Sequence, residues 1–403
     1  SIPLRLGLLD RQGNELQLQM ADEEASDGNT DRVLEITESE QELVFENIAE
    51  QPVPSLLRGF SAPVRLHYDY SREDFFFLMQ HDSDGFNRWS AAQSLAMDVM
   101  AEMQTTLSER DNTEVPAILL DAFGNVLDAV INDDSLDKAM IAHMLNLPSE
   151  SYQIEQAKVA DVDAIHTVRE GIANALAATH HDKFAQLYKD NDANWEFDVK
   201  AEDIARRALK NLSLAYLMRT DDEDWVQRCY WQFEGASNMT DQMAALRCLV
   251  NSSAATAKDL AGKALTAFYD AWQHEALVVD QWFVVQATCS LPGTLERVRK
   301  LMEHSDFQIR NPNKVRSLIG AFCANNHTAF HAKDGAGYEF LADQVLTLDK
   351  INPQIASRLL TPLTRWKKFD NDRQRLMQVQ LQRIKNSGEL SRDVFEVVEK
   401  STV

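Results

Sequence analysis

The stretch RWSAAQSLAMDVMAEM, residues 88–103, decides the fold class of most of this chain. Its apolar residues include Trp89, Ala92, Ala96, Val99 and Met103, which are three or four positions apart. Side chains at such spacings lie on one face of an α-helix, so the stretch predicts a helix with one buried face. The same period recurs in two further groups: Ile204, Ala208, Leu212 and Ala215, and Met377, Leu381 and Ile384.

Polar breaks separate these helical segments. They are rich in Asn, Asp, Ser and Pro, as at residues 132–135, 238–241, 311–313 and 352–353. A short polar side chain begins a helix well because it accepts a hydrogen bond from an unpaired N–H group of the first turn, and Pro lacks that N–H. Many such helices in succession predict a large all-α domain of the superhelical solenoid kind, similar to HEAT or ARM arrays, without a strict sequence repeat.

The first sixty residues have a period of two instead. Residues 3–10 and 15–20 alternate in part around a turn at Gly13 and Asn14, which predicts a β-hairpin. Residues 33–37 and 42–45 predict two more strands. The acidic stretch 21–31 has no apolar period and predicts a solvated loop.

Prolines mark the boundary between the segment with a strand period and the segments with a helical period. Pro52, Pro54 and Pro63 interrupt both strand ladders and helices. We therefore expect a multi-domain chain, with a small, incomplete all-β sandwich over residues 1–62 and an α-helical domain over residues 63–403. Three or four strands with an open edge make a poor independent fold, so we expect either that further strands of the sandwich precede Ser1 or that the open edge rests on a neighbour.

Charge and cysteine content exclude several functions. The formal net charge of −23 would repel nucleic acid and anionic membranes, and no run of about 18 apolar residues predicts a membrane span, so we expect neither partner. The cysteines are far apart, which predicts free thiols in a reducing cytoplasm. They are Cys229, Cys248, Cys289 and Cys323.

A zinc peptidase motif is incomplete wherever it begins. The HExxH pattern places two histidines one helical turn apart and a glutamate, the general base, beside the first. His274 has the glutamate but Val278 stands at the second histidine position, whereas His327 and His331 have the spacing but Thr328 replaces the base. We expect a capped surface turn at residues 327–331 and no catalytic or metal-ligating residue in the chain. The alternative is an unrecognised hydrolytic site at these two histidines.

Two arginines stand in apolar surroundings. Arg316 lies near the start of an apolar helix and Arg358 lies on an apolar turn. A guanidinium that faces a protein interior needs a carboxylate or carbonyl partner. From the residues alone, a structural salt bridge between helices is the favoured interpretation of both.

Several long segments resemble one family, the gluzincin zinc metallo-aminopeptidases of the bacterial aminopeptidase N type. They keep the order of the C-terminal half of that family and spread over most of the chain. They are QPVPSLLRGFSAPVRLHYDYS (51–71), RWSAAQSLA (88–96), SNMTDQMAAL (237–246), VVDQWFVVQAT (278–288), NPNKVRSLIGAF (311–322) and NPQIASRLLTPL (352–363).

The resemblance implies an immunoglobulin-like sandwich followed by a helical domain that walls and lids an active-site chamber for short peptides. It also implies that Arg316 and Arg358 point into the chamber and that Gln354 lies near the first side-chain pocket. The HExxH and GxMEN motifs of the family are absent, so the resemblance implies zinc in the parent enzyme but no cofactor and no enzymatic activity in this part. Its partners would be peptide substrates and the missing N-terminal and catalytic domains. The alternative is a stand-alone α-solenoid that binds proteins.

Overall fold

The computed structural model describes residues 1–24, 27–109, 114–192 and 197–402. Its tertiary contacts divide the chain into two compact units. Unit 1 contains residues 1–148 and 178–213, and unit 2 contains residues 149–177 and 214–403. We describe each unit by itself.

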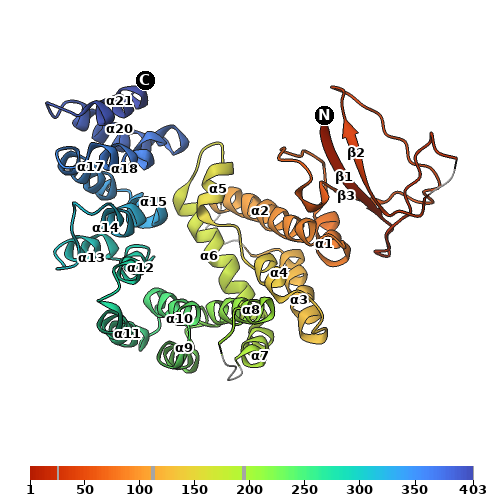
Figure 1. Ribbon diagram of the computed structural model, residues 1–403, viewed down its shortest axis with the longest axis horizontal. Coiled ribbons are helices and arrows are strands. Elements are labelled where there is room, and N and C mark those ends of the chain that lie inside the picture. Colours follow the sequence, from red (N-terminus) through yellow and green to blue (C-terminus); the bar gives the residue numbers. More distant parts are fainter. Residues whose placement is uncertain (25–26, 110–113, 193–196, 403) are drawn as a thin grey trace. The chain divides into compact units, whose positions relative to one another are not determined.

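Unit 1 begins with a three-stranded antiparallel sheet (Figure 1), in the order β2-β1-β3. The strands are β1 (Ile2–Leu9), β2 (Asp31–Ile36) and β3 (Val53–Leu56). The central strand β1 buries Leu6 and Leu8 against Leu18, and these form the small core of the sheet. The N-terminal part is therefore all-β, as its period of two predicts.

The predicted hairpin is wrong in its second strand. Residues 15–20 contribute only an isolated bridge between Leu9 and Glu15 and another between Met20 and Phe45, and the strand predicted at 42–45 is reduced to the second bridge. The chain changes partner after one turn, because the Leu16 N–H donates to Leu8 but the Leu18 N–H donates to Asn29. The strand that pairs along β1 is β2, which confirms the prediction at 33–37.

Strand β3 was not predicted, because its prolines were interpreted as a domain boundary. Val53 and Pro54 pair with Leu9 and Leu8 of β1. Proline is tolerated there because β3 is an edge strand, where a missing N–H leaves no ladder bond broken. The predicted loop at 21–31 has no regular structure up to its last residue, Asp31, which begins β2; residues 25–26 of that prediction lie outside the described residues.

A buried arginine ties the sheet to the first helices of unit 1. Arg58 lies in the short 3₁₀ turn η1 (Arg58–Phe60) and is 1% exposed. Its guanidinium contacts Glu15 at 2.9 Å and the fully buried carboxylate of Asp82 at 3.2 Å, and its Nε donates to Ser55. The predicted boundary between residues 62 and 63 stays a prediction, since the sheet and these helices share one compact unit.

Helix α2 in unit 1 buries the face that the period of its sequence predicts. Ala92, Ala96, Val99 and Met103 are all buried. The other helices of this unit pack around α2 and α3. The bounds are α1 (Arg72–His81), α2 (Gly85–Glu109), α3 (Ala117–Asn132), α4 (Lys138–Met144), α7 (His181–Asn191) and α8 (Ala201–Leu217), whose last residues belong to unit 2.

The face predicted for α8 is only partly correct. Leu212 is buried, but Ile204 and Ala215 are exposed. The helix instead buries the stripe of larger side chains formed by Leu209, Leu212 and Tyr216, which remove more apolar area from water than a stripe containing alanines.

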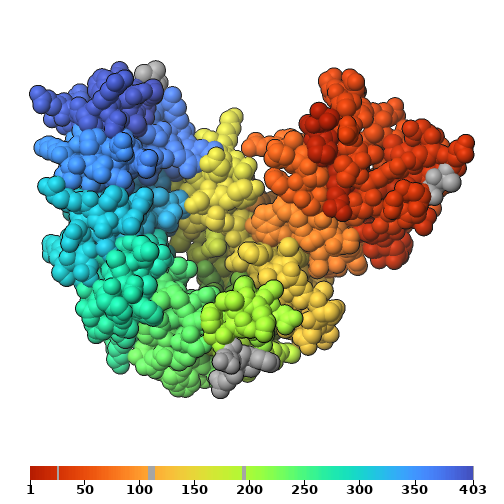
Figure 2. Space-filling view, viewed as in Figure 1, coloured from red at the N-terminus to blue at the C-terminus, as the bar shows by residue number. Residues whose placement is uncertain are grey.

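The regular elements among the described residues of unit 2 are helices, apart from one isolated bridge between Ala160 and Phe369. The unit is built mainly from successive helices that pack on their neighbours in sequence (Figure 1). Figure 2 shows helices α17–α21, coloured blue, as one densely filled part of this unit. The helices are α5 (Glu150–Gln156), α6 (Val162–Thr179), α9 (Glu223–Gly235), α10 (Met239–Asn251), α11 (Ala257–Trp272), α12 (Ala276–Ala287), α13 (Thr294–Leu301), α14 (Pro312–Val315), α15 (Ala321–Asn325), α16 (His327–Phe330), α17 (Ala336–Asp349), α18 (Pro353–Leu359), α19 (Thr361–Thr364), α20 (Asn371–Lys385) and α21 (Arg392–Ser401).

Several predicted breaks begin helices as their polar residues suggest. The side chains of Asn238, Asn311 and Asn352 accept N–H bonds in the first turns of α10, α14 and α18. The predicted stripe Met377, Leu381 and Ile384 in α20 is fully buried. Over the described ranges, no helix is long and apolar enough to cross a membrane.

Candidate functional site

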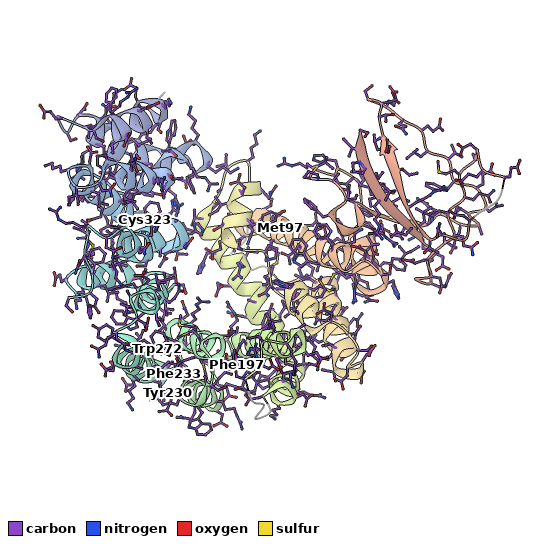
Figure 3. All side chains as sticks on the ribbon, viewed as in Figure 1. Met97, Phe197, Tyr230, Phe233, Trp272 and Cys323 are labelled. Carbon is purple, nitrogen blue, oxygen red and sulfur yellow. The ribbon has the colours of Figure 1, made fainter. Side chains whose placement is uncertain are left out.

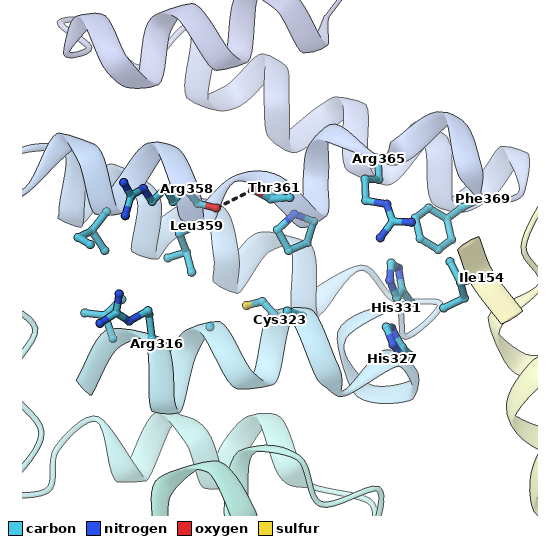
Figure 4. A pocket seen from close by; sticks show the side chains of 15 residues that line it. Ile154, Arg316, Cys323, His327, His331, Arg358, Leu359, Thr361, Arg365 and Phe369 are labelled. Carbon is cyan, nitrogen blue, oxygen red and sulfur yellow. Dashed lines mark hydrogen bonds between the residues drawn. The ribbon is translucent and has the colours of Figure 1, made fainter. Parts of the chain in front are cut away.

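A pocket of about 300 Å³ lies in unit 2, between the segment α14–α16 and the segment α18–α19 (Figure 4). Figure 3 shows one of its residues, Cys323, on α15. The pocket combines apolar walls with basic side chains, and its lining includes no Asp or Glu. The lining residues are Ile154, Val315, Arg316, Gly320, Cys323, Ala324, His327, His331, Ile355, Arg358, Leu359, Thr361, Pro362, Arg365 and Phe369.

Arg316 reaches the pocket from a π-helical turn, η2 (Arg316–Gly320), which joins α14 to α15. The residue is exposed, and its guanidinium donates to the side chain of Asn313. Lys314, two positions earlier, is buried and forms an ion pair of 2.8 Å with Asp280 of α12. This buried pair fixes the start of the segment from which Arg316 projects.

Arg358 reaches the same pocket from the opposite wall. It lies on α18 and is exposed, and Leu359 and Ile355 of the same helix line the pocket beside it. Gln354 lies on the first turn of α18, is exposed, and is not among the lining residues. The structure thus brings Arg316 and Arg358 to one pocket although they are far apart in sequence (Figure 4).

Neither arginine has the partner that a structural salt bridge requires. Within the part of the chain that the structure describes, no carboxylate forms an ion pair with Arg316 or Arg358. Their guanidinium groups therefore retain donors that can bind an incoming carbonyl or carboxylate.

The pocket has a second end that sequence reasoning did not identify. There Arg365, which follows α19, lies near His327, His331 and Phe369 (Figure 4). Arg365 is exposed and pairs with Glu155 of α5. The basic run Thr364-Arg365-Trp366-Lys367-Lys368 was its one signal in the sequence.

His327 and His331 form a parallel pair with ring centroids 6.2 Å apart. The ring of His327 bonds Ser151 at 2.7 Å through Nε2, and that of His331 bonds the Tyr338 hydroxyl at 2.8 Å through Nδ1. The predicted surface turn is wrong for His331, which is only 4% exposed because Phe369 covers its ring at 4.2 Å.

These histidines do not fit a zinc site. In residues 1–24, 27–109, 114–192 and 197–402, no three His, Cys, Asp or Glu side chains lie close enough to hold one metal ion. The pair also lacks a general base, since Thr328 stands where the glutamate would be. We therefore assign no metal-dependent step to this chain.

Burial controls the charge of His331. Desolvation, followed by the neighbouring His327 and Arg373, lowers the pKa of His331 to about 3. The ring is therefore neutral at physiological pH, with one nitrogen that donates and one that accepts.

A second, polar pocket of about 290 Å³ adjoins His327 in the same unit. Two of its lining residues, His166 and Glu150, contact each other at 2.7 Å, and a third, Glu170, pairs at 2.7 Å with Arg219, which does not line the pocket. The hydrogen bond that the Glu150 carboxylate accepts from His166 raises the pKa of the His166 ring. Because its charged groups satisfy one another, this pocket offers fewer unpaired donors than the first.

Comparison with protein families places the chain in a known class of folds. Residues 1–69 match the family described as "Domain of unknown function (DUF3458) Ig-like fold", and residues 72–403 match "Domain of unknown function (DUF3458_C) ARM repeats". The ARM-repeat model covers most of the chain, so the chain belongs to that family. The predicted fold class, a small all-β part followed by a large ARM-like helical domain, is confirmed.

The relatives that match this chain are aminopeptidases about twice as long as the chain itself. The chain is 39% identical to aminopeptidase N of Escherichia coli (strain K12) over 402 residues and 37% identical to aminopeptidase N of Haemophilus influenzae over 401 residues. Each match covers 99% of this chain and 44% of the relative. A crystal structure of Legionella pneumophila aminopeptidase A in complex with aspartic acid matches with a TM-score of 0.83 and 33% identity, over 99% of this chain and 45% of that one. The chain thus corresponds to part of an aminopeptidase N and spans less than half the length of these relatives.

Proposed function

We propose that this chain is the non-catalytic part of a zinc-dependent aminopeptidase that removes N-terminal amino acids from short peptides. Its helical domain would wall and lid the chamber in which the peptide is cut, and so limit access to it. Identity of 37–39% to the aminopeptidases N over nearly the whole chain supports the parent activity. The zinc and the general base would belong to domains outside this sequence, because no group of residues described here fits them.

The observation that carries the proposal is the pair of unpaired arginines at one pocket. Arg316 and Arg358 are exposed and converge on the same apolar-walled space from η2 and α18. A guanidinium presents its donors in a fixed planar fork, which suits peptide carbonyls or a terminal carboxylate. We propose that both bind the peptide and that Gln354, exposed beside them, contacts its first side chain.

Kinetics of the full-length enzyme test this role. Arg316→Ala or Arg358→Ala should lower kcat/KM for peptides by about tenfold each, because each removes a charge-assisted hydrogen bond to substrate. Arg375→Ala is the matched control, since Arg375 is exposed on α20 and does not line the pocket. A lower melting temperature with unchanged kinetics would instead indicate a structural role.

A separate experiment tests the proposal that this chain is the non-catalytic part of the enzyme. The purified 403-residue chain should not hydrolyse aminoacyl arylamides with or without added zinc. Zinc-dependent hydrolysis by this chain, abolished by changing His327 or His331, would overturn the proposal. We also place the enzyme in the reducing cytoplasm, which agrees with the free thiols of Cys229, Cys248, Cys289 and Cys323.

A further inference from the structure

The end of the pocket formed by His327, His331, Arg365, Phe369 and Ile154 has the composition of a ligand site (Figure 4). This end of the pocket, which we call the histidine end, is distinct from the end where Arg316 and Arg358 lie.

The hydrogen bond behind His331 occupies one of its two ring nitrogens. The Tyr338 hydroxyl and Nδ1 of His331 are 2.8 Å apart, and either can donate, depending on the tautomer of the ring. When Tyr338 donates to Nδ1, the single proton of the neutral ring lies on Nε2. A ligand that supplies an acceptor at Nε2 favours this tautomer.

Nε2 of His331 has no hydrogen-bond partner among the described residues. The side chain is only 4% exposed and lines the pocket, and its ring has a hydrogen bond only at Nδ1. Since Nε2 is not fully enclosed by protein, we infer that it faces the pocket. A nearly buried group of this kind gains most from a ligand that supplies its missing partner.

The backbone under His331 is held in place as well. Arg373 Nε donates to the His331 carbonyl at 2.9 Å, while its two other nitrogens contact Asp163 at 3.0 Å and Asp370 at 2.8 Å. Those two carboxylates are therefore engaged by Arg373. Protein contacts at its carbonyl and at Nδ1 hold His331 in place before any ligand arrives.

Charge and shape select the kind of acceptor. Arg365 adds a guanidinium at this end, which also pairs with Glu155 of α5, and no Asp or Glu is among the described residues that line the pocket. Ile154, Phe369 and Pro362 supply apolar walls. A site with fixed N–H donors, a guanidinium and apolar walls favours an anion with an apolar body, and it disfavours ammonium groups and metal cations.

We propose that the histidine end binds a monocarboxylate with an apolar body, whose carboxylate accepts from His331 Nε2 and Arg365. Two sources share this chemistry: a free fatty acid and the C-terminal residue of a peptide. The inference does not depend on the proposed function, because it concerns binding to this chain alone.

Calorimetric titration of the 403-residue chain at pH 7.5 tests the ligand class. The probes are octanoate with octanamide as its neutral match, and N-acetyl-leucine with N-acetyl-leucinamide as its neutral match. We expect at least one carboxylate to bind about tenfold more tightly than its amide. The carboxylate that binds more tightly identifies the source. Equal affinity for acid and amide, or no binding of either acid at about 10 mM, would overturn the proposal.

Variants test the two donors. His331→Asn keeps an acceptor near the Nδ1 position for Tyr338 but removes the Nε2–H donor, and Arg365→Gln removes the cation from an exposed side chain. Each should weaken binding of the carboxylate by about tenfold. Arg383→Gln is the matched control, because Arg383 is equally exposed and pairs with Asp343 in the same way, but does not line the pocket. Unchanged affinity in both pocket variants would refute the assignment.

Discussion

Acid should destabilise this chain through one buried side chain, His331. Its pKa is about 3 in the folded chain, against 6.5 for an ordinary histidine. The groups that act on it are His327, Arg373, Asp370 and Arg365, of which only Asp370 favours the charged ring. Between these two pKa values the unfolded chain binds a proton that the folded chain does not, so the free energy of unfolding falls as the pH falls.

The magnitude follows from the difference between the two pKa values. One pKa unit corresponds to about 1.4 kcal/mol, so lowering the pH from 7 to 4.5 should remove about 2.5 kcal/mol through His331 alone. Urea unfolding at both pH values measures the loss of unfolding free energy in the unmutated chain and in His331→Asn, whose side chain does not titrate. Other histidines, including His166 and His180, change equally in both proteins and cancel in the comparison.

We expect the free energy of unfolding to fall by about 2.5 kcal/mol more in the unmutated chain than in the variant. An equal loss in both proteins would refute the assignment of a neutral, desolvated ring. An independent check is the proton NMR titration of the His331 ring, which should show no midpoint above about pH 4.5. A midpoint near 6.5 would contradict the reasoning directly.

Further predictions concern two glycines and one buried ion pair. Gly337→Ala should lower the free energy of unfolding by about 1–3 kcal/mol, because a Cβ there would lie 2.2 Å from the Phe330 carbonyl oxygen. Gly262→Ala, in the exposed middle of α11, should raise the free energy of unfolding by about 0.5–1 kcal/mol. Urea denaturation of the two variants measures both signs, and a neutral Gly337→Ala would contradict the close approach. Arg58→Ala should cost about 3–5 kcal/mol by leaving the fully buried carboxylate of Asp82 without its cation, and a loss below about 1 kcal/mol in the same assay would show that the buried pair is relaxed by water.

Much of the fold was predictable because it depends on local periodicity. The stripe of α2 and the stripe of α20 were read correctly from apolar spacing. The failures arise where tertiary context overrides a local rule. Pro54 does not end the sheet, because β3 is an edge strand, and α8 turns its larger side chains inward and leaves Ile204 exposed.

The pocket was less predictable than the fold. Arg316 and Arg358 were singled out, but nothing local shows that both lie on one pocket without a carboxylate partner. For His331, the polar residues on either side indicated a surface turn. Two aromatic rings bury it: Phe369, which is distant in sequence, and Tyr338, which lies on the following helix, α17. No period in the sequence connects these residues with His331.

The contact between Arg373 and Asp163 also has a consequence for the order of folding during synthesis. These residues are 210 positions apart, and the start of α6 cannot complete its packing until Arg373 has left the ribosome. At about 5–20 residues per second, that interval lasts roughly 10–40 s. The contact between Asp163 and Arg373 therefore forms long after the contact between Glu170 of the same helix and Arg219, so α6 acquires its ionic partners in two stages during synthesis.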